Sequence, residues 1–153
     1  MKRSIFAAVA TFLLILCFSP QAQAQCKGFA KKICKAELGD FTHDGNFHAA
    51  ILTEGEEAEL YKTFYSDQEY RIAICGADGI PDVEFKVVDV NRNVLYDNKT
   101  NNYSKFWVFK LESSQQLKIM IKVVTNATAT PVAAYATPPS GCVSIMFGFK
   151  EKK

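Results

Sequence analysis

Two histidines and five cysteines are the residues of this 153-residue chain best suited to metal chemistry. His43 and His48 lie close to Asp40 and Asp44 in the sequence, and imidazole and carboxylate groups are common zinc ligands. In an extended segment, five residues of separation place the two imidazoles on opposite faces, and no Cys or Glu stands at a typical ligand spacing. A metal site would need a turn that brings them together. We therefore expect a polar loop, with no metal and no cofactor.

A second group of oxygen ligands, Asp89, Asn91 and Asn93, resembles the start of a calcium-binding loop. A helix-loop-helix calcium site requires glycine at the sixth position and glutamate at the twelfth. Val94 occupies the sixth position here, and no glutamate follows at the twelfth. The three residues are more typical of a turn between two strands, and weak calcium binding near Asp89 is left open.

Catalytic motifs are absent from the sequence. It has no Gly-x-Ser-x-Gly, no evident Cys–His arrangement and no glycine-rich phosphate loop. Glutamates cluster in residues 54–59, a pattern typical of a solvated strand edge. The sequence therefore predicts a protein that is not an enzyme. The third alternative is a small hydrolase whose catalytic residues come from distant strands, and it would require Asp40, His43 and Asp44 to lie together out of full contact with solvent.

Aromatic residues offer a candidate binding surface instead. Tyr61 and Tyr65 fall on one face of a predicted strand, while Leu60 and Phe64 fall on the other. Outward tyrosines would suit a sugar ring or a protein hot spot, although packing against neighbouring strands is the simpler interpretation. Two further tyrosines complete the candidate set, namely Tyr103 and Tyr135.

The chain opens with the features of a secretory signal. Lys2 and Arg3 precede an apolar run from Ile5 to Phe18, and small residues at 22 and 24 suggest cleavage after Ala24. The run is shorter than the roughly 20 residues that a membrane-spanning helix needs. We therefore expect residues 1–24 to be removed, leaving an extracytoplasmic protein, periplasmic or secreted, that does not span the membrane.

The predicted mature chain, residues 25–153, is long enough for a single domain. Lys2 and Arg3 are two of the 18 basic residues, so the mature chain carries 16 basic and 16 acidic residues. Such a neutral chain has no long-range field to attract phosphates, which argues against nucleic acid as its partner.

Four cysteines remain after the leader, Cys26, Cys34, Cys75 and Cys142, and an even number in an exported chain indicates two disulfides. Their spacing does not fit zinc or a Cys-x-x-Cys redox pair. Apolar residues recur at helical spacing in residues 25–38, which predicts one short helix. If that helix is unbroken, Cys26 and Cys34 lie about 12 Å apart and cannot bond to each other. Each would then reach Cys75 or Cys142.

Beyond residue 46 the pattern is typical of β structure, with residues 39–46 expected as a polar connection. Alternating apolar residues and turn signals predict about eight strands, which form an antiparallel, jelly-roll-like β-sandwich. The predicted strands are 47–52, 58–65, 69–75, 83–89, 94–97, 106–111, 117–125 and 142–150. Trp107 is expected in the core. Residues 126–141, rich in Ala, Thr and Pro and containing Tyr135, are expected as a long loop.

Three stretches match the glycosylation acceptor pattern, at Asn98, Asn102 and Asn126. The style of the leader looks bacterial, so these asparagines are interpreted as parts of polar loops.

The strand and turn pattern of residues 53–125 resembles small exported bacterial jelly-roll modules, and pre-peptidase C-terminal domains in particular. It is carried by Glu69–Ile74, by Val83–Asp89 with the turn at 91–93, and by Phe106–Phe109. The resemblance implies a non-catalytic accessory module. The N-terminal helix with its two cysteines, and the lack of an attached catalytic domain, depart from that pattern.

The leading hypothesis is therefore a binding module that contacts a protein of the cell envelope or of a secreted assembly. The alternative is a carbohydrate-binding module with an aromatic platform.

Overall fold

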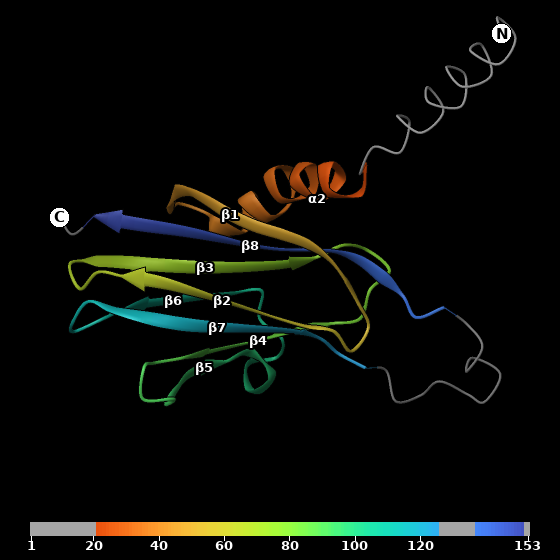
Figure 1. The fold of residues 1–153 in the computed structure, drawn as a ribbon. Coiled ribbons are helices and arrows are strands. Elements are labelled where there is room, and N and C mark those ends of the chain that lie inside the picture. Colours follow the sequence, from red (N-terminus) through yellow and green to blue (C-terminus); the bar gives the residue numbers. More distant parts are fainter. Residues whose placement is uncertain (1–20, 126–136, 152–153) are drawn as a thin grey trace, which may run out of the picture.

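Two antiparallel sheets face each other in the structure, a computed structural model that describes residues 21–125 and 137–151 (Figure 1). The first sheet has the strand order β1-β8-β3-β6 and the second has the order β2-β7-β4-β5. The strands are β1 (Thr42–Thr53), β2 (Glu57–Phe64), β3 (Gln68–Gly76), β4 (Val83–Val88), β5 (Val94–Asp97), β6 (Phe106–Lys110), β7 (Gln115–Val123) and β8 (Ser140–Glu151). The chain repeatedly crosses from one sheet to the other, which is the topology of an eight-stranded jelly roll. The predicted fold class is confirmed.

The core between the sheets is built from the alternating residues of the strands. The inward residues of β7 are Leu117, Ile119, Ile121 and Val123, all buried, and they face buried residues of β3 and β8. Successive side chains of a strand point to opposite faces, so the other residues of β7 point away from this core. Trp107 is half-buried and packs against the core, where its ring stacks on those of Tyr96 and Phe109.

The helix and the disulfides cover the side of the first sheet that faces away from the core. Helix α2 (Gln21–Lys32) is followed by a short 3-10 helix, η1 (Cys34–Leu38). The predicted helix is therefore present, but it changes type at Ile33 instead of running unbroken to residue 38. Cys26 bonds to Cys142 and Cys34 bonds to Cys75, so neither bond joins the two helical cysteines. A second apolar cluster fills the space beneath, namely Ala30, Cys34, Leu38, Phe41, Ala73, Cys75 and Met146.

The prediction of a polar connection over residues 39–46 is wrong for most of its length, because β1 begins at Thr42. Thr42 and His43 pair with Phe149 and Gly148, and the register then shifts before Phe47. The Asp44 carboxylate accepts a hydrogen bond from the Asn46 backbone N–H. The polar residues thus form a β-bulge within a strand, and turn chemistry of this kind is hard to distinguish from a loop in a sequence.

Asn98 also departs from its interpretation as part of a polar loop. It begins the 3-10 helix η2 (Asn98–Asn101), and only 1% of its surface is exposed. Its Oδ1 accepts a hydrogen bond from the Phe85 N–H, and its Nδ2 donates to the carbonyls of Val83 and Ser104. Asn98 therefore continues the pairing of β4 where β5 ends.

Candidate binding face

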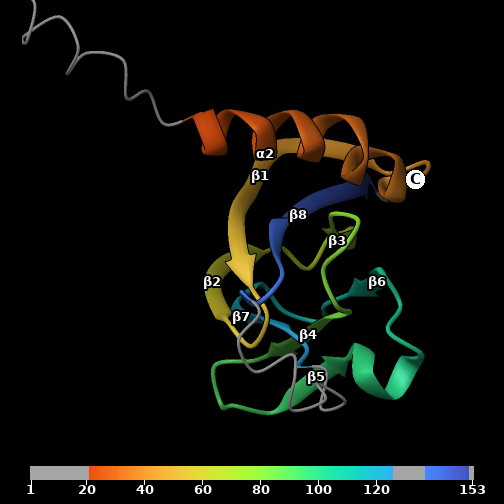
Figure 2. The same cartoon turned by 90° about the vertical axis from the view of Figure 1, so that its right-hand side faces the viewer.

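The two sheets differ in what covers the sides that face away from the core. Helices α2 and η1 pack against β1, β3 and β8 of the first sheet. Figures 1 and 2 show the second sheet on the opposite side of the molecule, with β5 far from α2. The outward side chains of β2, β7 and β4 consequently face away from the helix. No helix within the described residues is long and apolar enough to cross a membrane.

The register of the second sheet arranges these outward residues in three rows across the strands. The rows are Glu57, Lys122 and Glu84; Glu59, Met120, Lys86 and Asp97; and Tyr61, Lys118, Val88 and Val94. We call this surface the outer face. Side chains that lie opposite each other on neighbouring strands are close enough to interact, so each row acts as a unit.

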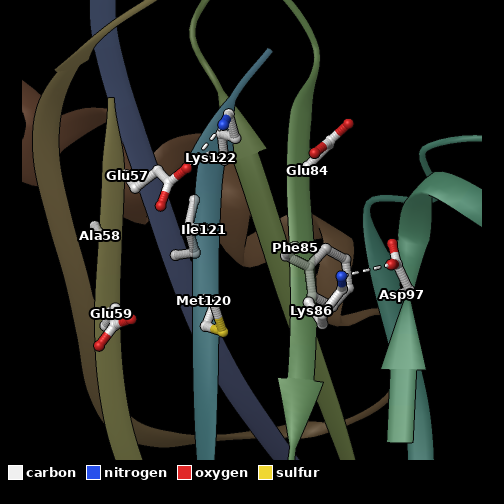
Figure 3. Close-up of a pocket in the computed structure, with 10 residues that line it drawn as sticks. All are labelled: Glu57, Ala58, Glu59, Glu84, Phe85, Lys86, Asp97, Met120, Ile121 and Lys122. Atoms are coloured by element: carbon white, nitrogen blue, oxygen red, sulfur yellow. Dashed lines mark hydrogen bonds and ion pairs between the residues drawn. The ribbon is translucent and has the colours of Figure 1, made fainter. Parts of the chain in front are cut away.

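Ion pairs neutralise the charges of the first two rows. Lys122 contacts Glu57 at 2.7 Å and Lys86 contacts Asp97 at 3.1 Å (Figure 3). The hydrogen bond from Lys122 lowers the pKa of the Glu57 carboxyl, and the same contact raises the pKa of Lys122. Glu84, the remaining acid of the first row, pairs with Lys99 of η2 at 3.1 Å, so both acids of that row have a basic partner.

Lys118 extends this compensation to the third row. Its ammonium group lies 2.7 Å from Glu59, and the hydrogen bond raises the pKa of Lys118. The same ammonium lies 5.9 Å from the centre of the Tyr61 ring, at the outer limit of a cation–π contact.

Two shallow hollows lie on the outer face and meet at Met120. The first, of about 160 Å³, lies among the charged rows, and Figure 3 shows its lining side chains along β2, β7, β4 and β5. The second, of about 480 Å³, lies at the other end of the face, and we call it the Tyr61 hollow. It is lined by Tyr61, Val88, Asp89, Val90, Arg92, Lys118 and Met120.

The Tyr61 hollow combines exposed apolar groups with a well-ordered turn. The side chains of Tyr61 and Val90 are 60% and 68% exposed. Asp89 fixes the turn between β4 and β5, because its carboxylate accepts hydrogen bonds from the N–H groups of Asn91 and Asn93 and from the Asn93 side chain. The last of these bonds is the main cause of the lowered pKa of Asp89. This turn places Arg92 beside the hollow.

The turn interpretation of Asp89, Asn91 and Asn93 agrees with these hydrogen bonds. No group of three or more His, Cys, Asp or Glu side chains in the described part of the chain is arranged to hold a metal ion.

The predicted tyrosines that the structure describes do not all line one hollow. Tyr61 lines the hollow, whereas Tyr65, 58% exposed, lies just beyond the end of β2 and is not among the lining residues. Tyr103 is half-buried, and its hydroxyl lies 3.4 Å from the carboxylate of Glu84 in the first row. Tyr135 lies outside the described residues.

The polar residues near the histidines have separate partners. Asp44 pairs with Lys62 at 2.6 Å, and Asp40 pairs with Lys150. His43 contacts the Asn46 carbonyl, and the His48 ring lies edge-on to Phe147, with 6.4 Å between ring centres. These contacts do not bring Asp40, His43 and Asp44 together as a catalytic group.

Sequence reasoning missed Arg92, Val90 and Met120 as surface residues. The signal for Met120 was present, because it alternates with Lys118 and Lys122 in β7 and so belongs to the outward set. A methionine among lysines on a solvent-facing strand is a residue to test for binding. Arg92 gave no comparable signal, since its position depends on the conformation of the turn, where its φ is +67°.

Comparisons with known proteins identify no family. No family model matches the chain, and none of the curated proteins matches it. Among solved structures it is similar to PliG of Aeromonas hydrophila, a periplasmic lysozyme inhibitor of g-type lysozyme. The TM-score is 0.48 at 12% sequence identity, and the match covers 69% of this chain and 85% of PliG. A likeness at this level carries no argument about what this chain binds.

Proposed function

We propose that this protein is a non-catalytic, extracytoplasmic module that binds another folded protein through its outer face. The observation that carries this proposal is the Tyr61 hollow, where an exposed tyrosine, a methionine and an arginine adjoin rows of compensated charge. Aromatic residues, Met and Arg are enriched in the centres of protein interfaces, and polar residues surround them.

The type of partner follows from charge and composition. The ion pairs leave the outer face without an excess of positive charge, so it offers no general attraction for a nucleic acid. The exposed apolar groups, Tyr61, Val90 and Val94, instead favour a partner surface with its own apolar centre.

Carbohydrate binding is the second candidate, because Tyr61 offers one exposed ring on which a sugar could stack. Tyr65 does not extend that surface into the hollow, since it is not among the lining residues. The geometry therefore supports a protein partner better than a glycan.

Location outside the cytoplasm is part of the proposal. The two disulfides suit an oxidising compartment. The predicted cleavage after Ala24 falls within α2, so the mature helix would begin at Gln25, next to the Cys26–Cys142 bond. The resemblance to pre-peptidase C-terminal domains stays a prediction and is compatible with an accessory role.

The experiment compares two exposed tyrosines. Tagged mature protein is crosslinked mildly in its native envelope or secreted fraction and recovered with its partner. Tyr61→Ala should reduce partner recovery at least about tenfold, the effect of losing a hot-spot residue, whereas Tyr65→Ala should leave it unchanged. Equal recovery with both variants would reject the outer face as the binding site. Retention on insoluble glycans that is lost only with Tyr61→Ala would favour carbohydrate.

A further inference from the structure

A groove separate from the outer face opens along one side of the sandwich. Strands β1 and β2 are the end strands of their sheets, and they follow each other along the same side of the molecule (Figure 2). The hollow between them has a volume of about 420 Å³, within the range of small-molecule sites. We call it the edge groove.

The inner wall of the edge groove is hydrocarbon. Buried residues of three strands form it, namely Leu52, Ile121, Val143 and Ile145, and Leu60 adds a half-buried side chain. Small residues, Ala49, Ala50 and Ala58, line the groove as well. Since Leu52, Ile121, Val143 and Ile145 belong to the main core cluster, a ligand in the groove would contact the core itself.

The rim carries the polar groups. Lys27 of α2 and His48 of β1 line the groove, and Glu59 is the acidic residue among the lining side chains. Glu59 already pairs with Lys118 at 2.7 Å. Lys27 is exposed and has no ion pair within the described residues. The uncompensated charge at the rim is therefore positive.

We infer that the edge groove binds an aliphatic chain that ends in a carboxylate, such as a fatty acid. The chain lies against the hydrocarbon wall, which removes apolar surface from water, and the carboxylate stays at the rim near Lys27. An ammonium head group lacks this partner, so the charge of the rim selects the acid.

An extended peptide fits the same groove less well. It could pair its backbone with one free strand edge, that of β1 or of β2, but its remaining N–H and C=O groups would face Leu, Ile and Val side chains that have no hydrogen-bonding atoms. Each polar group left unpaired there carries a free-energy cost. An alkyl chain has no such groups.

Isothermal titration calorimetry of the mature protein with dodecanoate, kept below its micelle concentration, tests this inference. Saturable binding with a stoichiometry near one is expected, and dodecyltrimethylammonium should bind more weakly. Absence of saturable binding, or equal binding of both amphiphiles, would overturn the inference. Binding of an extended peptide without binding of dodecanoate would overturn it too.

Two matched pairs of variants locate the site. Ala50→Phe fills the groove and should weaken dodecanoate binding at least about tenfold, while Ile51→Phe, at the exposed neighbouring position outside the groove, should not. Lys27→Glu should weaken binding by about two- to fivefold, the range of an exposed ion pair, and Lys32→Glu should have no effect.

Equal effects within either pair would contradict the assignment. Thermal unfolding of each variant confirms that it is folded. Tyr61→Ala should keep full dodecanoate binding, so this inference and the proposed function can fail separately.

Discussion

Replacing Asn98 with alanine tests the hydrogen-bond network that joins the second sheet to the loop before β6. The Asn98 side chain holds the Phe85 N–H at 2.8 Å and the Val83 carbonyl at 2.9 Å, with a longer bond of 3.3 Å to the Ser104 carbonyl. Asn98 is buried, so the groups left behind would lose partners at a place that water reaches poorly. A buried polar group without a partner costs about 1–3 kcal/mol.

Two well-formed bonds and one longer bond give an expected loss of about 3 kcal/mol for Asn98→Ala, with a range of about 2–5 kcal/mol. The control is Asn101→Ala in the same short helix. The Asn101 side chain is exposed and bonds to the Asp97 carbonyl, so the loss there should stay below about 1 kcal/mol.

Urea unfolding followed by fluorescence measures both variants, because the chain has a single tryptophan, Trp107, stacked on Tyr96 and Phe109. The midpoint for Asn98→Ala should fall by about 1–3 M, given a loss of about 3 kcal/mol and a urea dependence of about 1–3 kcal/mol per molar. If Asn98→Ala lost no more stability than Asn101→Ala, the assignment of Asn98 as the residue that continues the pairing of β4 would be refuted.

Three further predictions follow from individual contacts. Replacing Cys34 and Cys75 together with alanine should lower the free energy of unfolding by about 4 kcal/mol, because their bond closes a loop with a sequence separation of 41. Calorimetry under conditions that keep the other disulfide intact measures this loss. An unchanged melting temperature would contradict the prediction. Gly148→Ala should lower the free energy of unfolding by about 1–3 kcal/mol, since the added Cβ would lie 2.8 Å from the Cβ of Phe41. Urea unfolding measures this loss, and unchanged stability would show that the site relaxes freely. Asn93→Ala should raise the pKa of Asp89, because the hydrogen bond from the Asn93 side chain is the main cause of its lowered pKa. The lowered pKa of Asp89 stabilises the fold at pH values above the ordinary carboxyl pKa of about 3.9. This stabilisation is lost as the pH falls through the lowered pKa. The stability advantage of the wild type over Asn93→Ala should therefore disappear in acid, and an NMR titration that gives Asp89 the same pKa in both proteins would refute this cause.

The sequence predicted the jelly roll because its strands obey a local rule. In β7, apolar residues at every second position identified both the strand and its buried face. The absence of a bond between Cys26 and Cys34 was predictable for a similar reason, since the rise of a helix separates the two residues. Periodicity and covalent geometry act over a few residues, so one sequence is enough to apply them.

Features that depend on distant contacts could not be predicted in this way. Asn98 lies in an acceptor pattern for glycosylation. It is buried because its side-chain amide forms hydrogen bonds with the backbone of Val83, Phe85 and Ser104, which the fold brings next to it. Likewise, the turn residues 44–46 became a bulge because β8 continues to pair with the segment on both sides of them.

The sequence predicted only one residue of the candidate site, Tyr61. The alternation of β2 places Tyr61 outward, but its neighbours in the hollow come from β7, from the end of β4 and from the turn that follows β4. Which outward residues share a row depends on strand order, and strand order is a property of the whole fold. Sequence reasoning therefore grouped Tyr61 with Tyr65, its neighbour along the chain, and missed Arg92 and Met120.

Site-specific photocrosslinking at Met120 tests the central claim most directly, because both hollows of the outer face meet at that residue. A photoreactive side chain at position 120 should capture one partner protein in its native envelope or secreted fraction. The same group at Val108, an exposed position on β6 of the other sheet, should capture none. Capture at position 120 alone is the result that we predict; capture at position 108 alone, or equally at both positions, would contradict binding through the outer face.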